Sequence, residues 1–282
     1  MLFFAVHRSF LQNRRAHRLL EQQNEKIEKQ NKKITDSIEY AKRIQTALFP
    51  PVEKRKGILP DHFILYKPCD IVSGDFYWMA KKDKRVFIAV ADCTGHGVPG
   101  AFMSMLGVAI LCKTVNKKAA VYASGILNQL RGRIIHSLHQ RGRKDEARDG
   151  MEMALCIIDF EQLKIQFAGA HRPLYIIRNN ELMEIKGDKM PIGIHEGKRR
   201  TFTNHEVLLE QDDCIYLSTD GYADQMGGPN RKSFKTKYLK DLLLKNHHRE
   251  MQEQHRILES TIEDWRGELE QIDDMLLMGI RV

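Results

Sequence analysis

Residues 85–97 read RVFIAVADCTGHG, in which six consecutive apolar residues lead to Asp92 and then to a loop with two glycines. A short apolar run that is rich in β-branched and aromatic residues and ends at turn residues is typical of a buried strand. Asp92 thus follows a strand that fixes the origin of its carboxylate. Gly95, Gly97 and Gly100 place little bulk beside it, so a ligand can approach the backbone. We therefore expect a buried strand that delivers Asp92 to a functional site.

Three further stretches place an aspartate beside an apolar run, a glycine or a second acid. They are Gly74-Asp75-Phe76-Tyr77-Trp78, Ser218-Thr219-Asp220-Gly221 and Asp273-Asp274. For any one Asp-Gly pair, a turn or a helix cap is the more common explanation. Four carboxylates at the ends of apolar runs instead favour a site for two hard divalent cations, Mg²⁺ or Mn²⁺, with oxygen ligands. A pair of such cations indicates phosphoryl chemistry.

The charge of the chain is unevenly distributed. The chain has 282 residues, of which 42% are hydrophobic, enough for one large domain with a real core plus an extension. The formal net charge is +8, but residues 1–60 hold 13 Lys and Arg against 6 Asp and Glu, so the remainder is nearly neutral. No aromatic or glycine-rich recognition pattern accompanies this basic segment. A solvated basic helix is therefore favoured over a nucleic-acid site.

The five cysteines are scattered and show no CxxC spacing. This pattern argues against a disulfide framework and a zinc site, and it indicates a reducing, cytoplasmic compartment. We find no apolar run as long as a membrane span. Residues 1–6 are apolar and precede Arg8, Arg14 and Arg15, as at the cytoplasmic end of a membrane helix that begins outside this chain. An ordinary frayed N-terminus is favoured over this membrane helix.

The N-terminal segment is predicted to be one long helix. Residues 8–49 contain neither Pro nor Gly, and Pro50-Pro51 ends the pattern. Apolar residues recur at strict seven-residue intervals, as in the seam of a coiled coil, whereas the companion positions are mostly polar. A weak parallel dimer is favoured over a lone helix packed on the domain. The recurring residues are Leu20, Ile27, Ile34, Ala41 and Leu48, and the companions are Gln23, Gln30, Ser37 and Ile44.

The remaining chain alternates irregularly between extended and helical runs. We expect three parts, a basic helix over residues 1–49, a linker over 50–60 and a folded domain over 61–282. Segregated helices and strands with short hairpin links indicate an α+β sandwich, not a parallel βαβ fold. Asn179-Asn180 predicts a hairpin turn. Expected strands cover 85–91, 153–159, 164–170, 173–178, 181–185, 207–209, 214–217 and 275–282, and expected helices cover 100–112, 121–140 and the region of Leu258 to Leu269.

Taken together, five stretches resemble the metal-dependent serine/threonine protein phosphatases of type 2C (PPM), in the bacterial SpoIIE-like branch. The stretches are YAKRIQ (40–45), SGDFYW (73–78), ADCTGHGVPGA (91–101), STDG (218–221) and DDM (273–275). The resemblance covers about residue 40 to the C-terminus. It implies an αββα sandwich, in which two mainly antiparallel sheets are flanked by helices and a two-metal site lies at one end.

The resemblance also implies roles for individual residues. Asp92 would bridge two Mn²⁺ or Mg²⁺ ions, and the carbonyl of Cys93 would bind one of them. Asp220 and Asp273 would hold the other ion, with Asp75 supporting the site. Water between the ions would attack phosphorus without a phosphoenzyme intermediate, so Asp92 and Asp75 are the expected catalytic carboxylates. Asp274 is expected to orient the strand behind the ligands.

The pattern departs from the family at the phosphate-binding groups. His96 lies four residues after Asp92, so it is a candidate general acid, or its ring packs over the glycine loop. Cys69 occupies a position where a basic residue is common in this branch, which leaves Lys67 as a weak candidate for gripping phosphate. His171-Arg172 fits a hairpin approach to the catalytic rim, but we interpret it as a surface turn.

The function expected from the resemblance is a protein serine/threonine phosphatase. Its substrate would be a phosphorylated anti-sigma-factor antagonist or a similar small signalling protein. The N-terminal helix would form a homodimer and transmit its geometry to the catalytic domain, with an upstream sensor or membrane segment possible outside this chain. The alternative is a catalytically weak or inactive phosphatase-like module that binds a phosphoprotein partner. Nucleic acid is not an expected partner.

Overall fold

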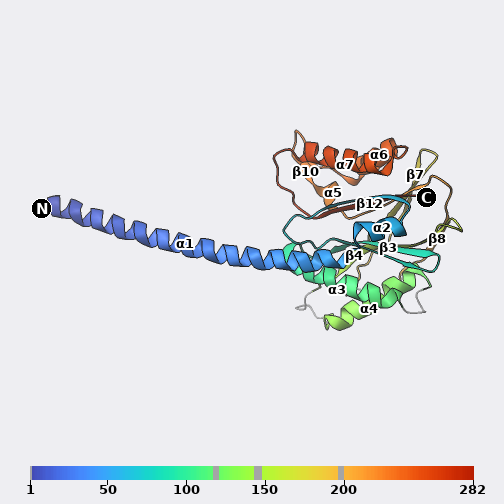
Figure 1. Cartoon of the computed structure of the whole chain (residues 1–282), viewed down its shortest axis with the longest axis horizontal. Coiled ribbons are helices and arrows are strands. Elements are labelled where there is room, and N and C mark those ends of the chain that lie inside the picture. Colours follow the sequence, from blue (N-terminus) through green and yellow to red (C-terminus); the bar gives the residue numbers. More distant parts are fainter. Residues whose placement is uncertain (1, 117–120, 143–147, 196–199) are drawn as a thin grey trace. The chain divides into compact units, whose positions relative to one another are not determined.

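The computed structural model describes residues 2–116, 121–142, 148–195 and 200–282. The chain divides into two compact units, Met1–Ile44 and Gln45–Val282 (Figure 1). The first unit consists of helix α1 (Leu2–Leu48), whose last turn belongs to the second unit. We describe the two units separately.

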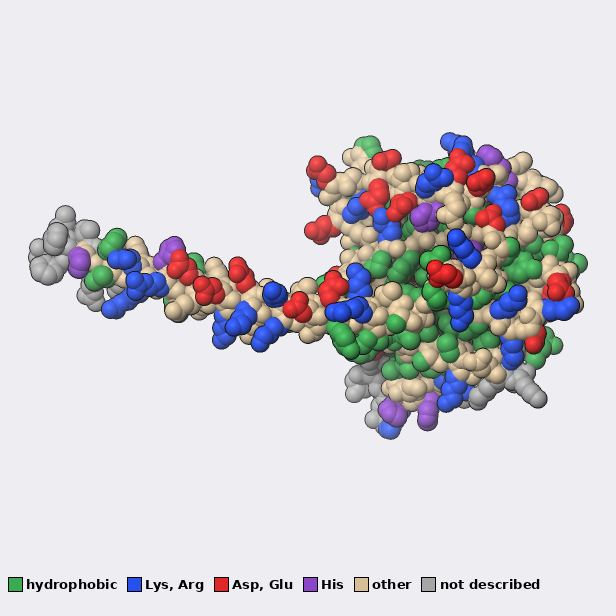
Figure 2. All heavy atoms as spheres, in the orientation of Figure 1, with side chains coloured by type: hydrophobic (Ala, Val, Ile, Leu, Met, Phe, Trp, Pro, Cys, Tyr) green, Lys and Arg blue, Asp and Glu red, His purple; other side chains and the backbone are tan. Residues whose placement is uncertain are grey.

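Helix α1 confirms the predicted N-terminal helix. It is continuous over 47 residues. Three residues of the seven-residue series are well exposed in the single chain, Leu20 at 56%, Ile27 at 52% and Ile34 at 58%. Side chains of both charges are interspersed along the helix (Figure 2). An exposed apolar row on an otherwise charged helix is typical of surfaces that pack against another helix.

The second unit is built on two five-stranded sheets in which every neighbouring pair is antiparallel. A two-stranded ribbon, β10 (Met226–Gly227) with β11 (Lys232–Ser233), lies outside them. In order across each sheet, the strands are β1 (Asp61–Lys67), β12 (Met275–Arg281), β9 (Cys214–Ser218), β6 (Leu174–Arg178) and β7 (Glu181–Ile185), and then β2 (Phe76–Lys82), β3 (Arg85–Cys93), β4 (Met151–Asp159), β5 (Lys164–Ala170) and β8 (His205–Leu208).

Helices cover the outer face of each sheet (Figure 1). Helices α3 (Gly97–Val115) and α4 (Ala123–Ser137) pack on the β2-to-β8 sheet, and α6 (Thr236–Asn246) and α7 (Met251–Arg266) pack on the other. Two short helices, α2 (Val52–Ile58) and α5 (Gly221–Asp224), complete the unit. The layers confirm the expected αββα sandwich.

Strand β3 shows why the central strands read as continuous apolar runs. Val86, Ile88 and Val90 pack between the two sheets, whereas Phe87 and Ala89 pack under the α3 and α4 helices. Because successive side chains point to opposite faces, a strand buried on both sides needs apolar residues at every position. The same reasoning holds for its neighbour β4. Three apolar clusters therefore separate the four layers.

The hairpin between β6 and β7 forms where the sequence predicted it. Asn179 and Asn180 have φ angles of 50° and 63°. Positive φ at both central residues is the geometry of a type I′ turn, which asparagine tolerates better than most residues.

The structure differs from the expected linker over residues 50–60. Residues 52–58 form helix α2, and Ile58 and Leu59 are buried in the cluster between the sheets. The charged run from Lys54 to Lys56 suggested a solvated linker. Lys54 and Lys56 are exposed, but Arg55 is half-buried over the Tyr77 ring, and the end of the helix contributes to the core.

Helix α3 corrects the statement that no apolar run reaches membrane length. Among the residues that the structure describes, α3 is the one helix that is long and apolar enough to cross a bilayer, judged by its 19 residues and composition. Met103, Val108 and Leu111 pack against the sheet and α4. A helix that is buried on most of its circumference has the same composition.

Two glycine-to-alanine substitutions should change stability in opposite directions. A Cβ at Gly279 in β12 would lie 2.2 Å from the Phe63 ring, whereas a Cβ at Gly132 in α4 would meet nothing within 4 Å. We expect Gly279→Ala to destabilise the domain by about 1–3 kcal/mol because it overpacks the core. Gly132→Ala should stabilise it by about 0.5–1 kcal/mol through helix propensity. Urea unfolding measures both, and an unchanged midpoint for Gly279→Ala would contradict this packing.

Candidate functional site

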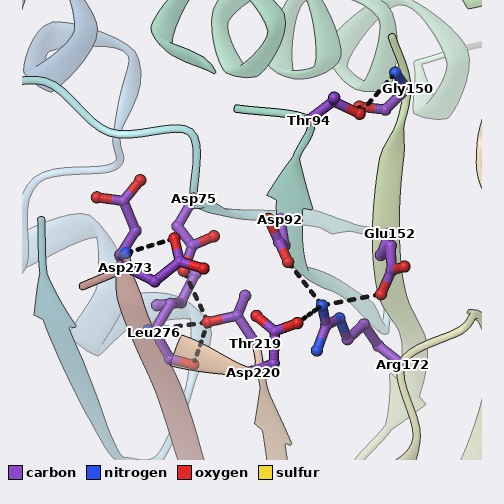
Figure 3. Close-up of polar contacts among 11 residues, drawn as sticks. Asp75, Asp92, Thr94, Gly150, Glu152, Arg172, Thr219, Asp220, Asp273 and Leu276 are labelled. Carbon is purple, nitrogen blue, oxygen red and sulfur yellow. Dashed lines mark hydrogen bonds and ion pairs between the residues drawn. The ribbon is translucent and has the colours of Figure 1, made fainter. Parts of the chain in front are cut away.

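The four predicted aspartates come from both sheets and meet at one end of the sandwich. Asp75 immediately precedes β2, and Asp92 is the second-to-last residue of β3. Asp220 follows the end of β9 by two residues, and Asp273 precedes the start of β12 by two. Asp92, Asp220 and Asp273 line one cleft of about 430 Å³. Asp75 is buried behind it (Figure 3). Three of the four expected carboxylates thus line one cleft.

Asp92 and two other carboxylates contact the same arginine side chain. Strand pairing places Asp92 directly opposite Glu152 of β4. Nη2 of Arg172 lies 2.6 Å from Asp92 Oδ2, 2.6 Å from Asp220 Oδ2 and 2.8 Å from Glu152 Oε2 (Figure 3). The Arg172 side chain is only 11% exposed. The interpretation of His171-Arg172 as a surface turn is thus wrong for Arg172, whose side chain enters the cleft. His171 is exposed, but it also lines the cleft and so lies at its rim.

Asp75 is held by a threonine from the other sheet. The Thr219 hydroxyl donates a hydrogen bond of 2.6 Å to Asp75 Oδ2 and accepts one of 3.1 Å from the backbone N–H of Leu276 (Figure 3). Thr219 therefore links the end of β9 and the start of β12 to the residue before β2. A buried hydroxyl that is satisfied in this way fixes the rotamer of the carboxylate it contacts.

Asp273 and Asp274 have different surroundings. Asp274 is buried, and its two oxygens accept hydrogen bonds of 2.7 Å from the backbone N–H groups of Cys69 and Gly74. It thereby orients the segment that leads to Asp75. Asp273 lines the cleft instead, and its Oδ1 accepts a 2.8 Å bond from the Asp274 N–H. This division of roles matches the expectation for Asp274.

The surroundings of these carboxyl groups disfavour their ionised forms. Burial raises the pKa of Asp92 to about 8, with Arg172 opposing and Asp220 and Asp273 reinforcing the shift. Burial, and then Asp92, raises the pKa of Asp75 well above its usual range. The pKa of Asp273 is raised in the same direction, mainly by burial. Desolvated like charges are destabilised in this way unless a cation compensates them.

The donor set fits hard divalent cations. Because one guanidinium nitrogen lies 2.6 Å from both Asp92 and Asp220, these two carboxylates are close enough to share a cation. Within the described part of the chain, no three His, Cys, Asp or Glu side chains come close enough to enclose an ion. Mg²⁺ does not require such a cage, since it keeps several waters and uses one or two carboxylates.

Glycines hold the loop after β3 in a tight turn. Gly95 has a φ of +82°, which other residues rarely adopt. A Cβ at Gly100 would lie 2.2 Å from the Gly95 carbonyl oxygen and 2.8 Å from the Gly74 Cα. Gly100 thus serves close backbone packing between the loop and the Asp75 segment, not the ligand access that the sequence suggested. Cys93, at the start of this loop, has a buried side chain within the apolar cluster.

His96 lies at the rim of the cleft and is 62% exposed. Its Nδ1 is 2.6 Å from Asp70 Oδ2, and this hydrogen bond is the main cause of the raised pKa of His96. The exposure of His96 and its contact with Asp70 favour the candidate general acid over the alternative, a ring packed over the glycine loop. A histidine at the rim of a cleft, with its pKa raised by a neighbouring carboxylate, is suited to donating a proton.

Gln45, within the YAKRIQ stretch, is a buried polar residue whose role the sequence did not reveal. Its Nε2 donates to the Ser73 carbonyl at 2.6 Å and to the Ser104 hydroxyl at 2.8 Å, and its Oε1 accepts from the Ser73 N–H at 3.2 Å. The amide thus joins the last turn of α1, the segment before Asp75 and helix α3. All these residues lie in the second compact unit.

The remaining candidates lie elsewhere. Lys67, the weak candidate for phosphate, pairs with Glu263 at 2.5 Å and Glu259 at 3.5 Å on α7. Sequence reasoning missed Glu152 and misjudged Arg172. Glu152 had a usable signal, an acid inside the apolar strand next to β3. Arg172 had a weaker one, a basic residue between the end of an apolar strand and a proline.

Two sequence comparisons relate the chain to characterised proteins. Residues 82–282 match the model of the family Stage II sporulation protein E (SpoIIE). The phosphoserine phosphatase RsbU of Bacillus subtilis (strain 168) is 25% identical over 198 residues, which are 68% of this chain and 54% of that protein. The chain therefore spans about half the length of this relative.

Solved structures give the same relationship. The SiaA-PP2C domain of Pseudomonas aeruginosa superposes with a TM-score of 0.80 at 33% identity, covering 89% of this chain and 98% of that one. A PP2C phosphatase domain of SpoIIE from Bacillus subtilis, solved with a fragment of its regulatory domain, gives 0.64 at 19% identity, covering 79% and 63%, and supports the fold alone. With a family model that matches most of its residues, this chain belongs to the SpoIIE family and has the PP2C phosphatase fold.

Proposed function

We propose that this chain is a protein serine/threonine phosphatase that depends on two divalent cations, Mn²⁺ or Mg²⁺. The observation that carries the proposal is that Asp92, Asp220 and Asp273 line one cleft, with Asp75 behind them. Membership of the SpoIIE family and the similarity to a phosphoserine phosphatase support it further. Phosphomonoester hydrolysis is the chemistry that such a carboxylate cluster serves best.

In this proposal each residue has one task. Asp92 would be shared by the two ions, the Cys93 carbonyl would contribute to one, and Asp220 and Asp273 would hold the other with support from Asp75. When bound, the ions would lower the pKa of a coordinated water and neutralise charge on the phosphate. The protein's own contribution is to hold these oxygens in place before substrate arrives, which is why buried bonds behind the carboxylates matter.

His96 is proposed to protonate the serine or threonine oxygen that leaves phosphorus. Its raised pKa keeps it protonated to a higher pH than an unpaired histidine. Asp70 holds the ring at the rim, where a phosphorylated side chain that enters the cleft would pass. The cleft, with a volume of about 430 Å³, is large enough to admit a phosphorylated side chain.

The substrate is proposed to be a phosphorylated signalling protein of the anti-sigma-factor antagonist type. The support is family membership together with the resemblance of the catalytic motifs. The exposed apolar series of α1 is proposed to form a parallel homodimer. Gln45 would then transmit changes in helix geometry to the Asp75 segment, because its amide holds Ser73 two residues away.

Replacing Asp92 tests the metal site. We expect Asp92→Asn to lower the Mn²⁺-dependent turnover of p-nitrophenyl phosphate by at least about 100-fold, because removing the bridging charge removes cation stabilisation. Asp241→Asn, at an exposed position on α6, is the matched control and should retain wild-type turnover. EDTA should abolish wild-type activity. Turnover that survives EDTA or Asp92→Asn would contradict the proposal, and a wild type that binds phosphoprotein without hydrolysing it would support the inactive alternative.

Replacing Asp70 tests the histidine at the rim. Asp70→Asn removes the negative charge from the group that accepts the His96 hydrogen bond and raises its pKa, so the imidazole should lose its proton at a lower pH. NMR titration of His96 in the wild type and the variant measures this shift directly. His96→Asn should lower kcat on a phosphoserine peptide about 10²-fold at neutral pH. Equal kcat values in wild type and His96→Asn would remove His96 from the mechanism.

Charges in the α1 seam test the dimer. We expect Ile27→Asp with Ile34→Asp to convert a dimer to a monomer in light scattering, because buried carboxylates face each other in a coiled-coil seam. Gln22→Asp with Thr35→Asp adds the same charge away from the seam and should leave the dimer intact. A dimer that resists the seam charges, or a wild-type monomer, would show that α1 does not self-associate.

A further inference from the structure

The position of Arg172 raises a question that the proposed metal site does not answer. One nitrogen of its guanidinium contacts carboxylates from β3, β4 and the end of β9. Two of these, Asp92 and Asp220, are the carboxylates proposed to hold divalent cations. Arg172 Nη2 contacts Oδ2 of Asp92 and Oδ2 of Asp220, so a divalent cation bound to these carboxylates would meet a second positive charge at the same oxygens. Like charges at this separation repel each other, so the guanidinium and the cation compete for Asp92 and Asp220.

The backbone of Arg172 keeps the side chain at the cleft when it moves. Its N–H donates to the Ala170 carbonyl at 2.7 Å, and the preceding His171 N–H donates to the Asp188 carbonyl at 2.9 Å. Pro173 follows directly and restricts the turn further. Arg172 itself lines the cleft. The guanidinium can thus swing by side-chain rotation alone, within a region bounded by the cleft walls.

The guanidinium has a donor that is not used. Arg172 Nε is buried and has no hydrogen-bond partner among the described residues. Burying an unpaired donor of a charged group is costly, so such atoms in native proteins call for an explanation. A phosphate offers several acceptor oxygens in a geometry that matches the Nε and Nη2 pair of an arginine.

Glu152 supplies the anchor for a second position of the side chain. It lies opposite Asp92 on β4, its side chain is 36% exposed, and it was not among the expected ligands. Its contact with Arg172 Nη2 can persist when the two aspartates bind cations. Held by Glu152 beside the proposed cations, Arg172 would lie where it can contact a substrate phosphate in the cleft.

We propose that Arg172 binds the phosphate group of the substrate, and that in the absence of metal the same guanidinium competes with the divalent cation for Asp92 and Asp220. The inference rests on the proposed phosphatase function and assigns the phosphate-binding residue that the sequence left open. Binding of the metal ions would then free the Nε and Nη2 groups of Arg172 for phosphate. The site becomes able to grip phosphate only when its cations are present.

Substitution of Arg172 should separate the two roles by opposite effects. Arg172→Gln should raise both the Ki of inorganic phosphate and the KM for p-nitrophenyl phosphate about 10- to 100-fold, the loss of charge-assisted hydrogen bonds. The same change should tighten Mn²⁺ binding measured by calorimetry in the absence of substrate, because a competitor is removed. Arg172→Lys keeps the charge without the fork, so it should leave Mn²⁺ affinity near wild type and recover only part of the phosphate affinity.

Arg256→Gln is the matched control, because Arg256 is exposed on α7 and lies outside the cleft. It should leave the Ki of phosphate and the Mn²⁺ affinity unchanged. The thermal shift on adding Mn²⁺ should be larger for Arg172→Gln than for wild type, which also shows that the variant is folded.

Two outcomes overturn the inference. A wild-type Ki for phosphate in Arg172→Gln removes Arg172 from phosphate binding, and Mn²⁺ binding that is unchanged or weaker removes the competition. Failure of the proposed function gives a different result, a wild type that binds Mn²⁺ yet does not hydrolyse p-nitrophenyl phosphate. The two failures are therefore distinguishable in one set of measurements.

Discussion

Desolvated carboxylates repel one another at one end of the sandwich, and the surrounding contacts are arranged to hold them there. Asp75, Asp92 and Asp273 all have raised pKa values, mainly because burial removes them from water. Such a cluster is stable only with a compensating cation or with bound protons. The fold brings the carboxylates together regardless, because β3 and β2 belong to one sheet and β9 and β12 to the other. The energetic cost of this arrangement is the signature of a functional site.

Buried hydrogen bonds keep the cluster in place. Thr219 reaches from one sheet to Asp75 at the edge of the other, and Asp274 holds the two backbone N–H groups that shape the segment before Asp75. Gln45 fixes the same segment from a third direction. The Asp75 segment is therefore connected to α1, α3 and both sheets, and a change in any of them reaches a proposed metal ligand through two or three contacts.

The sequence predicted those parts of the molecule that depend on local pattern. The strand before Asp92, the hairpin at Asn179-Asn180 and the long N-terminal helix all follow from periodicity or turn chemistry, which act over a few residues. The four aspartates were found because each follows or precedes an apolar run. The resemblance to a known family then predicted that the four aspartates share one site, and it predicted the order of the layers.

Features that depend on tertiary register were not predictable from the single sequence. Glu152 meets Asp92 only because β3 and β4 pair in one particular register. Arg172 reads as a turn residue, and its burial follows from the fold around it. His96 and Asp70 are 26 residues apart and meet only in the folded loop. Helix α2 reads as a charged linker because only its last residue and Leu59 contribute to the core.

Anomalous diffraction from crystals grown with Mn²⁺ would show whether these carboxylates bind cations. If the carboxylates from both sheets form a cation site, two peaks should lie between Asp92, Asp220 and Asp273, and the Arg172 guanidinium should have left Asp92. A map with no peak at this end of the sandwich, with Arg172 still bridging Asp92 and Asp220 at saturating Mn²⁺, would contradict it.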